Sequence, residues 1–576
     1  MFDSKKTSLY EKKETVVVDA LKKDANIFEK EMFEQEHQTL SGNGSVKLTS
    51  TGNPILDDFG SLSIYRAPRD PKEAFATMAT LYAYNSLLAL KETCYLRMIT
   101  RDTRYLEDIF KGSKGQGLRH EFNCRMIWLA KNHPDQWKEN LLLFISIGSW
   151  QDLFDQMELD LSYVHNGRNH ILDWKWIASF LANYLQDESQ TNLIKKYLPT
   201  IKNAKSCHTL HSQCTNYIGK YLATSWFNNT EKDKAYAQYR RLKSSGTAHS
   251  WQQAISRQDY SHINFNAIAG RALNWIANSK FLENHNLEEQ YEQWITSQPI
   301  AKFTGFVYEL FAKVTGSEKT YQIDTINKQF MQLVEEGKKG MQQGDKYIVC
   351  IDSSGSMGND ATGTTIPCLT VAKAIGLYMS YLLEGTPFAD TFMEFETHVH
   401  LHSWSHYISE DGWRKVEHIA TTPYEKFKNP LSGYWGSTDF VGCAEELVRM
   451  LQKGYKEEDF PTGLIAVSDG EFNRTENKSN FQAFRQVLRN GGFSKEYCDN
   501  FKIVLWDLSN SYYGGPKQKF EELADCPFCY QISGLDPAAL SFLFGKEVNG
   551  KVFVPKTAEE LMMLALGQDI LNLITV

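Results

Sequence analysis

The second half of the chain alternates short apolar runs with helical patterns, and this alternation limits its possible folds more than any other feature. Strands are predicted at residues 346–351, 391–395, 399–404, 462–467 and 501–506. Between them, residues 370–383 and 441–451 carry apolar side chains at helical spacing. Such alternation predicts a doubly wound α/β domain, a mostly parallel sheet with helices on both faces. Ligands of these sheets bind beyond the carboxyl ends of the strands, where the strand order reverses.

The first half of the chain carries helical patterns without strands. Residues 71–339 are broken only by short segments such as NHPD, and a helix over 120–131 places Phe122, Met126 and Leu129 on one face. Helices in series predict an all-α module of stacked pairs of the HEAT or armadillo kind, although no clear repeat period supports it. The predicted organisation is a mobile or partly helical tail over 1–50, a helical module over 51–340 and the α/β domain over 345–576.

Composition excludes some classes of protein. At 576 residues the chain is too long for one core, and its net charge of −8 gives no overall reason to bind nucleic acid. No apolar stretch approaches the 18 residues of a membrane span, and the first residues, MFDSKKTSLYEKKE, lack the apolar core of a secretory signal. We therefore read the ten scattered cysteines as reduced thiols and expect a cytoplasmic protein without membrane contact.

Oxygen-bearing side chains follow two of the predicted strands and precede one helix. Asp352, Ser354 and Ser356 occupy alternate positions directly after the first strand, in the glycine-containing loop DSSGSMG. Thr438 lies in GSTDF before the 441–451 helix, and Asp469 ends the strand of GLIAVSDGEF. If these strands are parallel, all five side chains meet at one edge of the sheet. Oxygen donors gathered there indicate a hard cation or a phosphate.

These motifs, DSSGSM, GSTD and a strand-terminal SD, together resemble the metal-ion-dependent adhesion site of a von Willebrand factor A domain, over roughly residues 345–576. The resemblance implies Mg²⁺, with Mn²⁺ or Ca²⁺ as competitors. It also implies that Ser354, Ser356 and Thr438 ligate the ion, that Asp352 and Asp469 hold waters and orient hydroxyls, and that a partner protein's acidic residue fills the open position. The simpler alternative is a Gly/Ser turn with a helix cap.

Stretches of the first half resemble the helical module that accompanies such a domain in the Ro ribonucleoprotein (TROVE) family. They are TGNPILDDF (51–59), LKETCYLRMITRDTRY (90–105), WLAKNHPDQW (128–137), IGSWQDLF (147–154) and AYAQYRRLKS (235–244). In the Ro proteins these helices form a ring that binds small noncoding and misfolded RNA. The resemblance implies the helical fold and an RNA ligand.

A locally basic region with interleaved tyrosines offers a place for small noncoding or single-stranded RNA. Cations for phosphates and rings for unstacked bases are the groups that single strands require. The alternative is that the tyrosines pack between helices and the lysines are solvated. The basic residues are Lys195, Lys196, Lys202, Lys205, Lys220, Arg240, Arg241 and Lys243, and the rings are Tyr197, Tyr217, Tyr221 and Tyr239.

Three further motifs are weaker. GKEVNGKV (545–552) approaches a phosphate-binding loop, but Val552 replaces the required Ser or Thr and a strand follows. His398, His400 and His402 alternate along one predicted strand, where an edge-strand face is a simpler explanation than a metal site. CPFC (526–529) is a lone C-x-x-C without the second pair of a zinc ribbon.

We therefore expect a non-enzymatic binding or scaffold protein with a Mg²⁺-dependent ligand site and an RNA-binding helical module. One alternative is a protein–protein adaptor for an ATPase or a viral assembly, without RNA. A weaker alternative is a metal-dependent hydrolase in which Glu471 or Asp439 acts as the base on a metal-bound water.

Overall fold

The computed structural model describes most of the chain, and contacts divide the chain into two compact units. The sheet unit comprises Met1–Ala67, Lys114–Gln116 and Ala269–Gln568, and the helical unit comprises Pro68–Ser113, Gly117–Ile268 and Asp569–Val576. The described residues are 26–61, 71–98, 117–165, 169–186, 194–202, 206–227, 231–245, 251–260, 263–303, 305–338, 346–361, 364–411, 414–431, 436–476, 478–508, 519–533, 542–543, 546–548 and 551–576.

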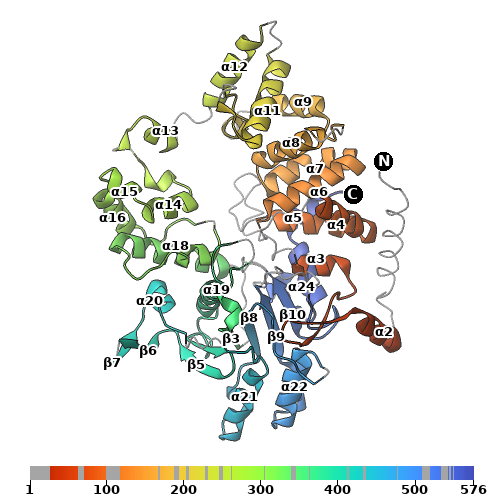
Figure 1. Ribbon diagram of the computed structural model, residues 1–576, viewed down its shortest axis with the longest axis vertical. Coiled ribbons are helices and arrows are strands. Elements are labelled where there is room, and N and C mark those ends of the chain that lie inside the picture. The colour runs from red at the N-terminus through yellow and green to blue at the C-terminus, as the bar shows by residue number, and fades with distance from the viewer. Residues whose placement is uncertain are drawn as a thin grey trace. The chain divides into compact units, whose positions relative to one another are not determined.

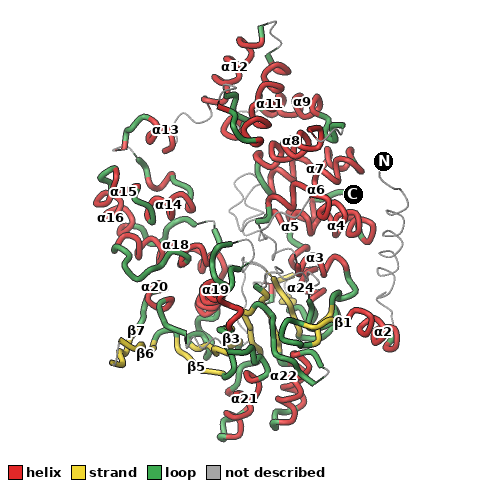
Figure 2. Tube along the Cα trace, in the orientation of Figure 1, coloured by secondary structure: helices red, strands yellow, loops and turns green. Residues whose placement is uncertain are grey.

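The helical unit is a succession of helices without a strand among its described residues (Figure 2). Helix α6 contacts four others, α4, α5, α7 and α8, and α11 contacts α8, α9 and α12. The last residues of the chain belong to this unit, where Thr575 exchanges backbone hydrogen bonds with the Asn140 side chain. Its elements are α4 (Pro71–Tyr84), α5 (Ser86–Arg97), α6 (Arg119–Asn132), α7 (Pro134–Ile147), α8 (Trp150–His165), α9 (Trp174–Tyr184), α11 (Leu210–Trp226), α12 (Lys232–Ser245), α13 (Trp251–Ser256), η5 (Phe265–Ala267) and η9 (Asp569–Leu573).

Buried ion pairs hold the middle of the helical unit together. Arg97 on α5 makes two hydrogen bonds of 3.0 and 2.9 Å to Asp152 on α8. Arg125 on α6 bonds to Glu92 at 2.7 Å and to Glu121 at 2.9 Å, with all three side chains almost fully buried. Breaking such a pair would leave one charge buried without its partner, which is strongly destabilising. These contacts therefore favour one packing of α5, α6 and α8.

The sheet unit contains every described strand together with the remaining helices (Figure 1). Its N-terminal elements are α2 (Ile27–His37), β1 (Gln38–Leu40), β2 (Val46–Leu48) and α3 (Pro54–Ser61). The helices before the sheet are α14 (Gly270–Ala277), α15 (Phe281–Asn284), α16 (Glu288–Ser297), α17 (Val307–Phe311) and α18 (Thr320–Lys338). The rest are β3 (Tyr347–Asp352), η6 (Gly355–Gly358), α19 (Cys368–Leu382), β4 (Thr391–Phe395), β5 (Val399–Ser403), β6 (His406–Asp411), β7 (Arg414–Ile419), α20 (Pro423–Phe427), α21 (Gly442–Gln452), η7 (Glu457–Asp459), β8 (Gly463–Ser468), α22 (Asn480–Asn490), α23 (Lys495–Asn500), β9 (Lys502–Asp507), β10 (Cys529–Ser533), β11 (Lys546–Val548), β12 (Lys551–Phe553) and α24 (Ala558–Leu566).

Six strands form the central sheet in the order β10-β9-β8-β3-β4-β5. Neighbours pair in parallel except β5, which runs antiparallel to β4 at one edge. All five predicted strands are present. The first and last residues of each strand lie within one residue of the predicted bounds. The chain moves from β3 to β4 on one side and later returns to β8 on the other, so the strand order reverses beside β3. The α/β and helical content predicted from the sequence is therefore confirmed.

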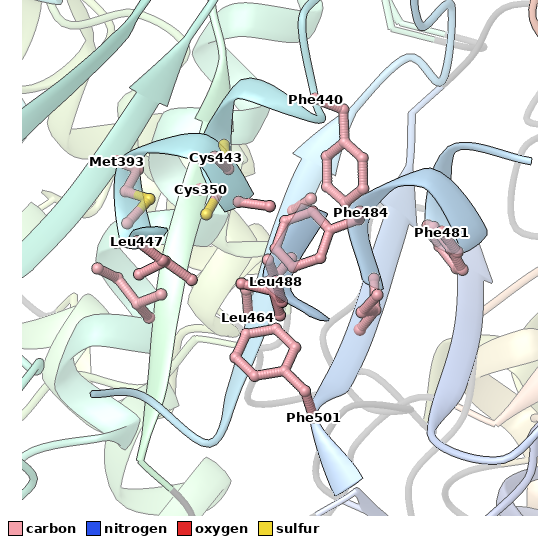
Figure 3. Packing of buried hydrophobic residues seen from close by; sticks show 14 of the residues in the cluster. Cys350, Met393, Phe440, Cys443, Leu447, Leu464, Phe481, Phe484, Leu488 and Phe501 are labelled. Carbon is pink, nitrogen blue, oxygen red and sulfur yellow. The ribbon is translucent and has the colours of Figure 1, made fainter. Parts of the chain in front are cut away.

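Helices cover both faces of this sheet. On one face, α21 and α22 pack on alternate strand residues and build a core rich in phenylalanine (Figure 3). Phe440 and Phe484 lie 5.2 Å apart between ring centroids in this core. On the other face α19 packs against β3 and β8. Gly376 allows this close approach, since a Cβ there would lie 2.9 Å from Ile351 Cδ1.

Helices α14–α18 belong by contacts to the sheet unit, although the sequence-based range of 51–340 assigns them to the helical module. Helix α17 contacts α19, and α18 contacts both α19 and α20. Gly337 on α18 lies so close to Tyr378 on α19 that a Cβ would meet its hydroxyl at 2.1 Å. None of the described helices combines the length and the apolar character that a membrane span requires.

A half-buried lysine on α19, Lys373, predicts how stability changes with pH. Lys373 donates to the Asn429 carbonyl and lies 5.0 Å from the Phe427 ring centroid. Burial lowers its pKa to about 7, although the negative charge of Glu394 acts to raise it. Between that pH and the ordinary lysine pKa, the unfolded chain keeps a proton that the folded chain has lost. Stability therefore rises with pH across this window.

We predict that Lys373→Met removes this rise. The unfolding free energy of the variant, relative to that of the parent, should fall by about 3 kcal/mol between roughly pH 6.5 and 9.5. Urea denaturation at each pH measures the difference. The control is Lys428→Met, an exposed lysine that also lies over a ring, that of Tyr424. Equal pH slopes for the two variants would contradict the assignment.

Candidate functional site

Asp352 ends the central strand β3 and fixes the two loops beside it. Its side chain is fully buried, and its Oδ1 accepts the Ser354 N–H at 2.8 Å. Its Oδ2 accepts the Ser468 hydroxyl at 2.5 Å. Because Ile351 and Val467 are register partners of β3 and β8, the hydrogen bond from Ser468 joins the loops that follow these two strands. Asp352 is thus an anchor of the strand ends.

The serines of the DSSGSM loop lie next to one another. The hydroxyls of Ser354 and Ser356 are 3.2 Å apart, and Ser354 precedes the short helix η6. The Ser356 hydroxyl also lies near enough to the Asp469 carboxylate to act on its pKa. The structure therefore joins four of the five predicted metal-site residues, Asp352, Ser354, Ser356 and Asp469, in one connected set.

The fifth predicted residue, Thr438, lies in a loop whose backbone is hydrogen-bonded to the DSSGSM loop and to the loop that follows Asp469. Thr438 is buried, its N–H donates to Asn473 Oδ1 at 3.1 Å, and its carbonyl accepts the Asn473 N–H at 2.9 Å. Two residues earlier, the Gly436 carbonyl accepts the Gly355 N–H at 3.3 Å. These backbone bonds hold the Thr438 loop against the loops that carry Ser354 and Asp469.

Two carboxyl groups are buried beside each other in this set. Burial, and then the charge of Asp469, raises the pKa of Asp352 to about 7. Burial also raises the pKa of Asp469, although the nearby Ser356 hydroxyl acts to lower it. Carboxylates this close repel, and a cation among them removes the penalty. All the donors of this set are oxygens, and the two hydroxyls among them are neutral, which suits a hard ion such as Mg²⁺.

The carboxylates considered as catalytic bases already have partners. Glu471 accepts the Gly42 N–H through Oε2, and its Oε1 lies 3.2 Å from the Lys519 ammonium. Asp439 Oδ1 accepts the Gly442 N–H at 3.0 Å, at the start of α21. Glu471 thus binds the hairpin turn that contains Gly42, and Asp439 binds the N-terminal end of α21.

The N-terminal hairpin β1–β2 forms a wall of the site that the sequence analysis did not anticipate. Ser41 donates to the Phe472 carbonyl at 3.3 Å, and Asn43 donates to the Glu471 carbonyl at 2.5 Å. Gly44 and Asn473 form an isolated bridge. The SGNGS turn between two short runs is a recognisable hairpin signal, but its docking partner is more than four hundred residues away.

Lys47 from the same hairpin is buried beneath the Asp469 loop. Its ammonium donates to the Gly470 carbonyl and lies 3.1 Å from Glu521 Oε1, with both side chains almost fully buried. It also lies over the Phe472 ring, 5.1 Å from the centroid. Its charge lowers the pKa of Asp469, though less than burial raises it. No local pattern marks a lysine for burial, so the sequence offered no signal for it.

The predicted RNA-binding residues gather around α11, α12 and the segment before α11. Lys205 lies outside the described residues. Tyr239 is buried and donates to the Pro199 carbonyl at 2.9 Å, and Lys243 donates to the Lys196 and Leu198 carbonyls. These two side chains connect α12 to the preceding segment, as the packing alternative expected.

The remaining basic residues are more accessible. Lys196, Lys202, Arg240 and Arg241 are exposed, while Lys195 and Lys220 are half-buried. Tyr217 is 53% exposed, with one edge against Trp174. Ammonium groups lie over two rings, Lys196 over Tyr197 at 5.5 Å and Lys220 over Tyr236 at 5.8 Å. Cations and accessible rings therefore share this surface.

The other motifs do not form the sites they resemble. The predicted histidine strand is the edge strand β5, where His402 pairs with Glu394 at 2.8 Å and His400 lies 3.9 Å from Glu396. The described part of GKEVNGKV forms the hairpin β11–β12, without the helix that a phosphate-binding loop needs.

Comparison with known proteins identifies no relative: no family model matches the chain, and no curated protein matches its sequence. The geometry of the site and the motifs themselves are therefore the basis for assigning a function.

The burial of Lys47 predicts a strong effect on stability. In Lys47→Met, Glu521 stays buried without its cation, which should lower the unfolding free energy by about 3–5 kcal/mol. Adding Glu521→Gln should restore part of the loss, because a neutral amide costs less to bury. Urea denaturation measures both. Arg449→Met, which removes an exposed pair with Glu446, should leave the midpoint unchanged. A Lys47→Met midpoint equal to that control would be the contrary result.

Proposed function

We propose that the chain is a binding protein whose sheet unit holds one Mg²⁺ at the carboxyl edge of β3 and β8, in the manner of a von Willebrand factor A domain. The ion presents an open position to an acidic residue of a partner protein. The proposal places the chain inside the cell and assigns it no enzymatic activity.

One observation carries the proposal. The cluster of Asp352, Ser354, Ser356 and Asp469 lies where the strand order reverses, the place at which sheets of this kind bind ligands. A Gly/Ser turn with a helix cap would explain the Ser354 loop alone. It would not explain a second buried carboxylate, Asp469, arriving from β8 beside the same hydroxyls.

The side chains have different roles in this proposal. Ser354, Ser356 and Thr438 would ligate the ion, while Asp352 and Asp469 would hold waters and orient the hydroxyls. A bound Mg²⁺ supplies an electrophilic centre that few anions neutralise. An incoming carboxylate therefore gains more from this ion than from one already surrounded by aspartates. The Ser468 bond to Asp352 fixes that carboxylate before any ion arrives.

Hydrolysis fits the same residues less well. A base on a metal-bound water needs a carboxylate free to take the proton. Both carboxylates considered for that role, Glu471 and Asp439, are committed to backbone N–H groups.

We extend the proposal to RNA for the helical unit, as in the Ro proteins that its stretches resemble. Support comes from the surface that combines exposed Lys196, Lys202, Arg240 and Arg241 with the accessible ring of Tyr217. The overall negative charge confines any such binding to this surface. An adaptor without RNA is the competing function.

Mn²⁺ binding, followed by electron paramagnetic resonance, tests the metal site. The parent chain should bind one Mn²⁺ that Mg²⁺ displaces. Ser354→Ala and Ser356→Ala should each weaken binding about 10- to 100-fold, because each removes an oxygen donor from the set. Ser353→Ala is the matched control, a buried serine of the same loop outside the set, and it should bind like the parent.

Equal loss in all three serine variants, or no stoichiometric binding by the parent, would contradict the metal site. Partner binding is tested separately by affinity capture from the native host. The captured proteins should be lost with chelator and with Ser354→Ala, and kept with Ser353→Ala.

Ultraviolet crosslinking tests RNA binding. Replacing Lys195, Lys196, Arg240 and Arg241 with Gln should reduce crosslinked RNA at least tenfold, because four phosphate contacts disappear. The control replaces four exposed lysines elsewhere, Lys131, Lys175, Lys302 and Lys495, and changes the net charge equally. RNA capture that falls equally in both variants, or that is absent in the parent, would favour the adaptor without RNA.

A further inference from the structure

A second cluster of potential metal ligands lies outside the Asp352 site. Glu522, Cys526 and Cys529 bring a carboxylate oxygen and two sulfurs within 4.8 Å of one another, and no other group of His, Cys, Asp and Glu side chains meets that criterion among the described residues. Ligand atoms around a shared zinc ion lie about 3.5–4 Å apart. The three ligand atoms of this cluster would therefore need to move only slightly closer together to coordinate one ion.

The fold holds the two cysteines at fixed positions. Cys529 begins β10 and is buried in the core of the sheet, where it pairs with Ile503 of β9. Phe528 takes a left-handed conformation with φ of 60°, and its N–H donates to the Lys556 carbonyl at 2.7 Å. The turn that results directs Cys526 back to Cys529, so that the two sulfurs lie within 4.8 Å of each other.

Glu522 is oriented from another element. The Ser479 hydroxyl, at the N-terminus of α22, donates to Glu522 Oε1 at 2.6 Å. Glu522 and Cys529 also line a cavity of about 20 Å³, together with Thr51, Phe520 and Gln531. A cavity of this size holds one water molecule. A fourth ligand position therefore has room beside the three side chains.

Several carboxylates surround this cluster, and one of them, Glu521, is paired with Lys47. Glu521 and Glu34 both lie near enough to Glu522 to act on its carboxyl group. Asp525 nearby pairs with Lys30. Arg485 acts on both Glu522 and Cys529, and its guanidinium donates to the carbonyls of Phe501 and Pro527. A bound cation would offset the remaining negative charge.

We propose that Glu522, Cys526 and Cys529 bind a zinc-like divalent cation, with a water from the adjoining cavity in the fourth position. Two thiolates exclude Mg²⁺ and Ca²⁺ as preferred occupants and select Zn²⁺ or a comparably soft ion. On binding, each thiol releases its proton to solvent. The ion would connect the start of β10 to the 522 segment, so its role is structural.

The sequence motif alone does not indicate this site. CPFC lacks a second C-x-x-C, and the third ligand is a glutamate four residues before Cys526. The E-x₃-C-x₂-C spacing acquires meaning only when the turn at Phe528 and the bond from Ser479 bring the three groups together.

Cobalt titration of the full chain tests the proposal. The protein is reduced, stripped with chelator, and titrated with Co²⁺ in the absence of oxygen. We expect a thiolate-to-cobalt charge-transfer band that saturates at one equivalent and disappears when Zn²⁺ is added. Cys526→Ser should abolish the band, and Glu522→Gln should weaken Co²⁺ binding at least tenfold.

Two control variants isolate the site. Cys207→Ser changes a half-buried cysteine of the helical unit and should keep the full band. Ser354→Ala alters only the proposed Mg²⁺ site and should also keep it, so the two proposals succeed or fail separately. Because Cys526 is only half-buried, Cys526→Ser should retain the parent's circular dichroism.

A band that survives in Cys526→Ser, or a reduced parent chain that shows none, would overturn the assignment. In the second case the cysteines would be a hydrogen-bonded thiol pair only.

Discussion

The interaction on which the candidate site depends is the hydrogen bond between Ser468 and Asp352, made across the neighbouring ends of β8 and β3. It fixes the carboxylate of the central strand and joins two loops whose sequences are more than a hundred residues apart. Asp469 follows Ser468 directly, so the same contact brings a second carboxylate to the Ser354 and Ser356 hydroxyls. Without this bond, the DSSGSM loop would be a turn at the end of a strand.

The proposed Mg²⁺ and zinc sites lie in the same unit but have opposite chemistry. The Asp352 set offers oxygens only, from two carboxyl groups and two hydroxyls. The Glu522 set offers two sulfurs beside a small cavity. Ligand softness therefore gives the two sets different preferred ions, because oxygens favour Mg²⁺ and thiolates favour Zn²⁺.

Much of the sheet could be predicted because its strands are short buried runs with clear punctuation. YIVCID and GLIAVS are buried at every position, and their bounds were found within one residue. β10 was missed because CYQIS is short and follows Pro527, and the β6–β7 hairpin was missed because its faces are polar and exposed. The polar loop residues were found because a strand end followed by Asp and Ser is a local signal. Lys47, Asn473 and Glu521 were not found, since each owes its position to a partner distant in sequence.

The hairpin that walls the Asp352 site has a consequence for how the chain acquires its structure. Lys47 and Gly470 are separated by 423 residues. At about 5–20 residues per second, the ribosome makes the first of these residues roughly 20–85 s before the second. During that time Lys47 has neither its buried carboxylate nor the carbonyl it will cap. The N-terminal hairpin therefore cannot complete its docking until residue 521 has been made, so the loop of Asp469 is braced only when most of the polypeptide has been synthesised.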